Sequence, residues 1–191
     1  HFPFVLCLTS FETVGLLEFL EMVEERFSLT MVDRIITNAD LPSGGIYTAV
    51  GTYPHSEMVA LVVNLSKETN IPLPTLLHSF GQRLFQSFAV RYAHFLNHTP
   101  SAFAFLERLE SYVHAEVRKL YPEAELPTFE CSKVADNCMV LHYQSHRALG
   151  DVAHGLIEGC FQHFHEQVQI EREELSATPG ASVRFILTTA G

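Results

Sequence analysis

The spacing of apolar residues changes near Pro127, and this change divides the chain into two structural parts. Before Pro127, apolar residues recur at three- and four-residue steps, which is typical of helices that each bury one face. After Pro127, short runs alternate between apolar and polar residues, as they do in half-buried strands. We therefore predict an α+β chain in which a helical N-terminal part packs on a C-terminal antiparallel sheet crossed by a helix.

The helical part is predicted from repeated apolar positions and from proline and glycine breaks. Leu16, Leu20, Val23 and Phe27 illustrate the pattern, and Leu41–Gly45 is a clear interruption. The predicted helices run from Thr13 to Phe27, from Met31 to Ala39, from about Pro54 to before Pro72, from Pro74 through Phe88, and from Ser101 to Pro122.

The part after Pro127 is predicted to contain two hairpins and one helix. Residues 134–137 have the composition of a turn and connect the first two strands. The predicted strands are Thr128–Lys133, Met139–Ser145, Val168–Glu173 and Val183–Thr188, and the helix between the hairpins is Ala148–His165.

Composition excludes several classes of protein. With 191 residues, of which 47% are hydrophobic, the chain is long enough for one domain with a real core. A net charge of −10 disfavours non-specific binding to nucleic acid, because the phosphates would meet a negative surface. The longest apolar runs are shorter than the roughly 18–20 residues that a bilayer span needs. We expect a soluble, cytoplasmic protein with no membrane segment.

The cysteines carry little information. Cys7, Cys131, Cys138 and Cys160 form no C-x-x-C pair and no zinc-ribbon spacing, although Cys131 and Cys138 could flank a hairpin. We expect reduced, partly buried thiols and no structural disulfide.

One face of a predicted strand changes from apolar to polar along its length. Residues two apart on a strand share a face, so Met139, Leu141, Tyr143, Ser145 and Arg147 point the same way, from apolar through hydroxyl to guanidinium. An amphiphilic ligand with an acidic edge would match this face, because Arg can hold a carboxylate through two hydrogen bonds. An ordinary half-exposed strand is the alternative interpretation.

Histidines supply two further candidates. His114 lies at the edge of an apolar helical stripe, either as a hydrogen-bonded boundary residue or as an axial ligand to a metal. His154, His163 and His165 lie near Cys160, but His154 and His163 point in roughly opposite directions on a helix. A solvent-exposed helix face is the alternative to a transition-metal site there.

Taken together and in order, these residues resemble the haem nitric oxide/oxygen binding (H-NOX) family, which includes the haem domain of soluble guanylate cyclase and bacterial gas sensors. The similar stretch runs from about Leu106 to Phe164. It contains a helix ending at His114, then Pro127-Thr128-Phe129-Glu130-Cys131, Tyr143-x-Ser145-x-Arg147 and Gly155-Leu156-Ile157-Glu158-Gly159.

The resemblance implies a stand-alone bacterial sensor formed by a single domain over residues 1–191. Its distal helical part would cover about 11–100 and its proximal α+β part about 101–191, with haem b between them. His114 would be the axial ligand of the haem iron, and Pro127 would press on the porphyrin. The haem propionates would be held by Tyr143, Ser145 and Arg147, and the distal pocket would be formed by Phe19, Leu84, Phe88 and Val152.

The resemblance also implies a ligand and an output. Oxygen-binding members carry a Tyr five residues after the motif Arg, where this chain has Val152, so we expect binding of NO, and also of CO, with discrimination against O₂. NO would weaken the bond between iron and His114 and so switch a partner. The chain ends about where the haem domain ends, so a histidine kinase or a cyclic-di-GMP enzyme would act in trans.

The sequence departs from the family at two places. It has Phe11-Glu12-Thr13 where members have Met-Lys-Gly, and its cysteines do not reproduce the zinc site of some bacterial relatives, so no zinc is predicted.

Two other functions remain open. One is a haem-free interaction module of the same fold that responds to redox state through Cys131 and Cys160, and the other is an enzyme with a His/Cys metal site.

Overall fold

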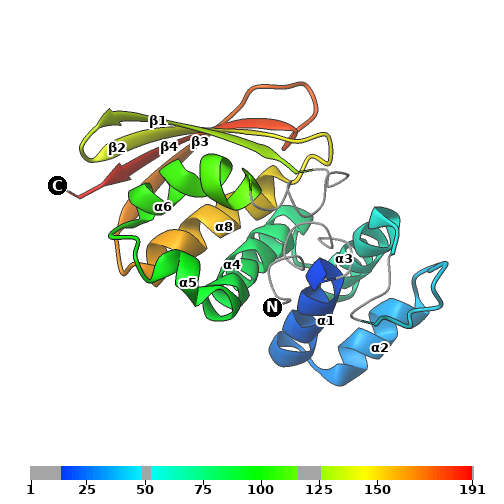
Figure 1. Cartoon of the computed structure of the whole chain (residues 1–191). Helices are drawn as coiled ribbons and strands as arrows, with labels where there is room; N and C mark the ends of the chain where they lie inside the picture. Colours follow the sequence, from blue (N-terminus) through cyan, green and yellow to red (C-terminus); the bar gives the residue numbers. More distant parts are fainter. Residues whose placement is uncertain (1–13, 49–52, 116–125, 191) are drawn as a thin grey trace.

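The computed structural model describes residues 14–48, 53–115 and 126–190, and its two parts follow the predicted division (Figure 1). The first helices of the chain, coloured blue to cyan, lie together at one end of the molecule, while the sheet covers the other end and the later helices. Among the described residues before Pro127, the helices are α1 (Val14–Arg26), α2 (Leu29–Thr37), α3 (His55–Thr69), α4 (Leu73–Arg91), α5 (Ala93–Leu96) and α6 (Ala102–Arg108), followed by the π-helix η2 (Leu109–His114).

Helix starts follow the capping residues in the sequence. The Ser28 hydroxyl accepts the backbone N–H of Met31 at 3.1 Å, and the Ser101 hydroxyl accepts that of Ala104 at 3.2 Å. Pro74 lies in the first turn of α4, where its missing N–H costs no helical hydrogen bond. The first four predicted helices are confirmed in place, and the short α5 is an addition that the apolar spacing did not indicate.

The predicted helix from Ser101 to Pro122 is only partly correct. It is α-helical through Arg108 and then widens into the π-helix η2, which ends at His114. Residues 116–122 of the predicted helix lie outside the described residues. Apolar spacing does not reveal the π-turn, because the four-residue step from Leu109 to Val113 is compatible with a π-turn as well as with an α-turn.

The C-terminal part is a four-stranded antiparallel sheet with strand order β1-β2-β4-β3. Its strands are β1 (Thr128–Ala135), β2 (Cys138–Gln144), β3 (Val168–Glu174) and β4 (Ser182–Thr189), and α8 (Gly150–His163) lies between the hairpins in sequence. α8 and α6 lie under one face of the sheet (Figure 1). The predicted α+β fold is thus confirmed, with β2 ending one residue before the predicted Ser145.

Two hydrophobic cores meet where α4 and α8 pack together. One core joins the sheet to α6 and α8, and the other lies among α1, α2, α3 and α4. Val152 of α8 belongs to this second core, and Leu156 of α8 packs against both.

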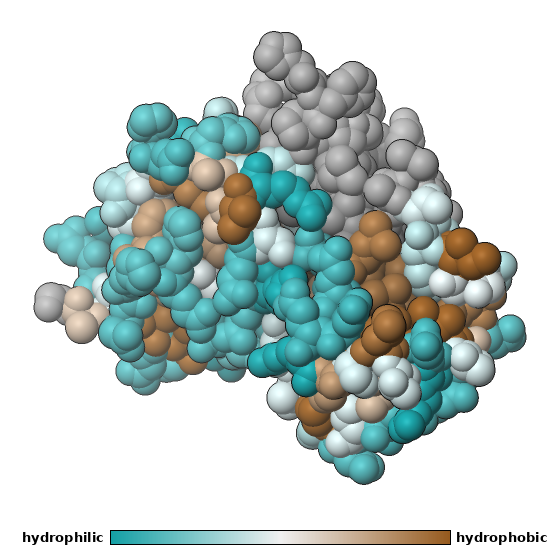
Figure 2. Space-filling view, turned by 90° about the horizontal axis from the view of Figure 1, so that it is seen from below, coloured by the Kyte–Doolittle hydropathy of each residue, from teal (hydrophilic) through white to brown (hydrophobic). Residues whose placement is uncertain are grey.

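The face of the molecule opposite the sheet is mainly hydrophilic, with hydrophobic residues in separate groups (Figure 2). None of the helices in the described residues is long and apolar enough to cross a membrane.

A buried carboxylate fastens α1 to α4. Glu18 is only 3% exposed, and its carboxylate accepts hydrogen bonds from the Ser87 hydroxyl at 2.6 Å and from Arg91 at 2.7 Å. Both partners lie on α4. Since a buried carboxylate is tolerated only with such donors, this contact orients α1 on the helix that also carries residues of the cavity described next.

Candidate functional site

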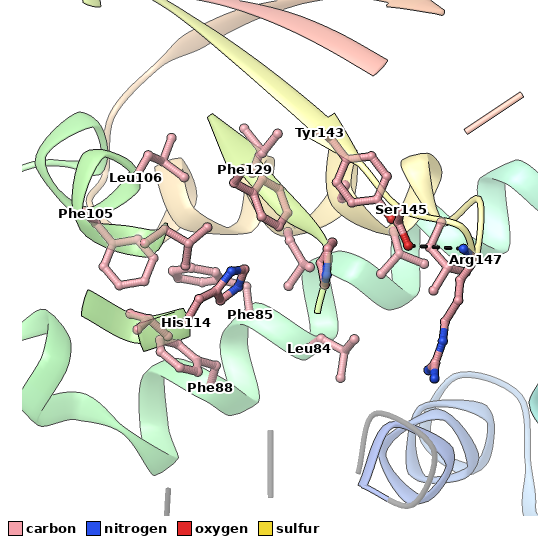
Figure 3. Close-up of a pocket in the computed structure, with 18 residues that line it drawn as sticks. Leu84, Phe85, Phe88, Phe105, Leu106, His114, Phe129, Tyr143, Ser145 and Arg147 are labelled. Carbon is pink, nitrogen blue, oxygen red and sulfur yellow. Dashed lines mark hydrogen bonds between the residues drawn. The ribbon is translucent and has the colours of Figure 1, made fainter. Parts of the chain in front are cut away.

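A large cavity lies between the two parts of the molecule (Figure 3). It contains about 1100 Å³ of empty space, a volume that includes space open to solvent. Its walls come from α4, α6, η2, β1, β2 and α8 and from the segments that precede β1 and α8. The lining residues are Leu84, Phe85, Phe88, Phe105, Leu106, Leu109, Val113, His114, Pro127, Phe129, Tyr143, Ser145, Arg147, Leu149, Val152, Ala153, Leu156 and Ile157.

His114 contributes an imidazole to this cavity from the end of η2. Its side chain is 2% exposed, and its Nδ1 lies 2.8 Å from Oε2 of Glu110, four residues earlier. With Nδ1 occupied, the second ring nitrogen, Nε2, is the atom left to act as a ligand. Phe129 of β1 packs beside the ring, with centroids 5.8 Å apart.

Hydroxyl and guanidinium groups enter the same cavity from the end of β2. In Figure 3, Ser145 and Arg147 lie at one side of the pocket and His114 at the other. Burial raises the pKa of Tyr143, although Ser145 opposes the shift, so the phenol stays protonated and can donate a hydrogen bond at neutral pH. The backbone N–H of Arg147 donates to the Ser145 hydroxyl at 3.2 Å.

The turn that carries Ser145 and Arg147 is tied to the loop between β3 and β4. The N–H of Ser145 donates to Ala181 O at 2.8 Å, and the N–H of Gly150 donates to Gly180 O at 3.0 Å. Ala148 has a φ of 52°, a left-handed conformation that non-glycine residues rarely adopt. These contacts hold the turn where the regular strand has already ended.

The wall formed by α4 and α8 is hydrocarbon. Within the described residues, these helices contribute to the lining only Leu84, Phe85, Phe88, Val152, Ala153, Leu156 and Ile157. Phe19, which was also expected in the distal pocket, is not among the lining residues. It packs edge-to-face on Phe80, with centroids 5.6 Å apart, in the core of the helical part. The other predicted site residues all line the cavity.

The chemistry of this lining fits a haem group. A broad apolar space suits a porphyrin, and the imidazole of His114 supplies a nitrogen of the kind that ligates haem iron. The Arg147 guanidinium with the Tyr143 and Ser145 hydroxyls supplies donors of the kind that a buried carboxylate requires. The apolar wall, the ligand nitrogen of His114 and the groups that can donate hydrogen bonds to a carboxylate thus line the same cavity.

The other histidine and cysteine candidates do not converge. The His154 ring contacts that of His78 at a centroid distance of 4.8 Å, whereas His163 contacts Phe85 and Phe164. In the described part of the chain, no group of three or more His, Cys, Asp or Glu residues is placed to hold a metal ion. Cys131 and Cys138 lie on adjacent strands but are not opposed, since Cys131 faces Leu141 and Cys138 faces Ala135.

Two residues that contact His114 were not singled out as site residues from the sequence. Glu110 contacts His114, and the i,i+4 spacing of the two residues on a predicted helix is a signal that could have identified it. Phe129 lies within a matching motif, but its position against the imidazole depends on β1 packing beside η2. No periodicity within the sequence encodes that packing.

Comparisons with known proteins agree with this geometry. The family model described as haem-NO-binding matches residues 16–172. The structure is similar to that of the Fe(II) unliganded H-NOX protein from K. algicida, with 36% identity, coverage of 93% of this chain and 96% of that chain, and a TM-score of 0.86.

Two further solved structures are similar. The H-NOX protein from S. oneidensis in the Fe(II)NO state has 25% identity, coverage of 93% and 97%, and a TM-score of 0.81. The H-NOX from Shewanella woodyi in the Fe(II)CO state has 37% identity, coverage of 91% and 92%, and a TM-score of 0.77. None of the curated proteins searched matches the chain. The chain therefore belongs to the haem-NO-binding (H-NOX) family of haem-binding, gas-sensing domains.

Proposed function

We propose that this protein is a haem-based sensor of nitric oxide that signals through a partner protein. The observation that carries the proposal is the convergence of His114, Arg147 and an apolar wall on one cavity. Ferrous haem b, when bound, supplies an iron atom that binds a diatomic gas. The residues of the chain hold that group, shape the space for the gas and change position when the gas binds.

Each part of the cavity has a role in this proposal. His114 offers Nε2 to the iron, while Tyr143, Ser145 and Arg147 donate hydrogen bonds to the propionates. Pro127 lies in the lining just before β1. There it would press on a bound porphyrin. Leu84, Phe88 and Val152 exclude water from the gas-binding side, since all three are hydrocarbon.

The hydrocarbon wall supports selectivity for NO over O₂. Bound O₂ carries partial negative charge and is stabilised by a hydrogen-bond donor, whereas bound NO depends on such a donor far less. Val152 is 2% exposed and has no donor to offer. CO binds by the same reasoning, and the H-NOX of Shewanella woodyi has been solved in the Fe(II)CO state.

The switch would be His114, which would hold the haem iron and would be released from it on NO binding. His114 is the last residue of η2, and η2 packs against α6 and β1, so its displacement is transmitted to the sheet. The receiver is a histidine kinase or a cyclic-di-GMP enzyme, as the family resemblance implies. The function is thus a ligand-biased conformational change rather than catalysis.

The haem-free redox module is less well supported. Burial, together with the negative charges of Glu107 and Glu110, raises the pKa of Cys131 to about 11. Burial also raises the pKa of Cys160, whose side chain is fully buried. Since the thiolate is the reactive form, both thiols are poorly suited to sensing oxidants.

Absorption spectra of the purified, haem-loaded chain test the proposal. We expect a ferrous Soret band that shifts with NO and with CO and does not change in air. The His114→Ala variant should lose haem, while a His98→Ala variant, altered outside the cavity, should retain it. Absence of a Soret band from the native chain would refute the proposal, and an O₂ complex in air would refute its NO selectivity.

A further inference from the structure

We propose that Glu110 is a positioning residue for His114, holding the imidazole so that Nε2 faces the cavity and strengthening it as a ligand. This inference rests on the proposed function, because it assigns Glu110 a role in the bond that His114 makes to iron. It concerns a residue that lines no part of the cavity itself. Its basis is the contact between the Glu110 carboxylate and Nδ1 of His114 at 2.8 Å.

One oxygen of the Glu110 carboxylate makes two hydrogen-bond contacts. Oε2 of Glu110 is 2.8 Å from Nδ1 of His114 and also accepts the backbone N–H of Phe129 at 3.3 Å. Phe129 belongs to β1 and its ring packs beside the imidazole. The position of the carboxylate is therefore set by the sheet as well as by η2, and the imidazole is oriented relative to both.

The acceptor decides which nitrogen carries the proton. A carboxylate can only accept, so Nδ1 carries a proton, and in the neutral imidazole Nε2 then carries the lone pair. That tautomer is the one needed for ligation through Nε2. A carboxylate that accepts from Nδ1–H also strengthens the imidazole as a metal ligand.

Burial makes the contact effective. The His114 side chain is 2% exposed and that of Glu110 is 31% exposed, so the hydrogen bond is largely shielded from competing water on the histidine side. Loss of a comparable partner of a metal-bound histidine costs about 10- to 100-fold in metal affinity or activity. Glu110 therefore sets how firmly His114 is held, and with it the threshold for release on NO binding.

Glu110→Gln provides the first test in the haem-loaded ferrous protein. The amide keeps the size of the side chain but removes the charge, so the iron–His114 stretching frequency in resonance Raman spectra should fall. Glu110→Ala removes the acceptor, so the frequency should fall further and haem should dissociate about 10-fold faster. Glu107→Gln is the matched control, because it removes the same charge from an exposed position on α6.

The outcomes separate this inference from the proposed function. A fall in frequency for Glu110→Gln, with Glu107→Gln unchanged, supports the positioning role. If the native protein binds haem through His114 but Glu110→Gln has the native frequency, the positioning role is refuted and the sensor remains. If the native protein binds no haem, the sensor proposal itself fails. Circular dichroism of Glu110→Gln confirms that a lower frequency does not reflect unfolding.

Discussion

Gly81 of α4 and Gly155 of α8 lie against each other where the two helices cross. A Cβ atom on Gly81 would lie 3.0 Å from the Cα of Gly155 and would overlap the carbonyl oxygen of Val152. A Cβ atom on Gly155 would overlap the carbonyl oxygen of His78. The two backbones therefore touch, and this close crossing brings the distal and proximal parts together around the cavity.

Replacement of Gly155 by alanine should destabilise the protein. Within a helix, Gly→Ala ordinarily stabilises by about 0.5–1 kcal/mol, but here the methyl group meets the backbone of α4, and overpacking costs about 1–3 kcal/mol. Urea unfolding should show a lower midpoint for Gly155→Ala. Gln86→Ala, on an exposed position of α4, should stay within about 0.5 kcal/mol of the native value. Equal stability of the two variants would exclude a tight crossing.

Arg147→Gln should weaken haem retention without preventing folding. The substitution removes a charged donor from the cavity, and hydrogen bonds to charged groups are worth about 1.5–3 kcal/mol, which corresponds to about 10- to 100-fold faster haem loss. Haem transfer to an excess of a high-affinity acceptor protein measures the rate. Arg34→Gln, which breaks an exposed ion pair with Glu68 on the helical part, should leave the rate unchanged. Native-like haem loss from Arg147→Gln would remove Arg147 from the proposed site.

Val152→Tyr should create an oxygen-binding protein. The phenol would place a donor in the hydrocarbon wall, and a partly charged O₂ would be held by it. Val152→Phe introduces the same ring without the hydroxyl and controls for the added volume at a position that is 2% exposed. Spectra in air should show an O₂ complex for the tyrosine variant only. If both variants bind O₂, or neither does, the hydroxyl is not what decides selectivity.

Stability should fall at alkaline pH partly through Cys131. Burial raises the pKa of this thiol from 9.0 to about 11. Below pH 9 the thiol is protonated in both the folded and the unfolded protein. Between about pH 9 and about pH 11 only the unfolded protein loses this proton, so the free energy of unfolding falls over that range. The urea midpoint should therefore decline over that range, and less steeply in Cys131→Ala. Parallel curves for the two proteins would show that Cys131 does not contribute.

Local pattern was sufficient for most of the fold. The three- and four-residue spacing before Pro127 predicted the places of α1 to α4, because each of these helices buries one face. Period-two alternation predicted all four strands, since one face of the sheet is covered by helices. The π-helix was missed because the four-residue step from Leu109 to Val113 is compatible with an α-turn as well, and α5 because four residues hold no period.

The shape of the cavity depends more on tertiary contacts than the helices and strands do. The interpretation of Tyr143, Ser145 and Arg147 as one face assumed a strand through Ser145, yet β2 ends at Gln144. These side chains still line one cavity because the turn after β2 is tied to Ala181 and Gly180 by backbone hydrogen bonds. Phe19 was placed in the pocket by resemblance, whereas packing on Phe80 puts it in the neighbouring core.

By itself, the sequence determined which segments form helices and strands and which side chains carry chemistry, since both depend on neighbours a few residues apart. Only the tertiary structure decided that Glu110 faces His114 and is held by the N–H of Phe129, that Gly81 and Gly155 let two helices touch, and that one cavity lies between the two parts. Those contacts join residues from different elements, and their distances are set by how helices and strands pack rather than by their order in the chain.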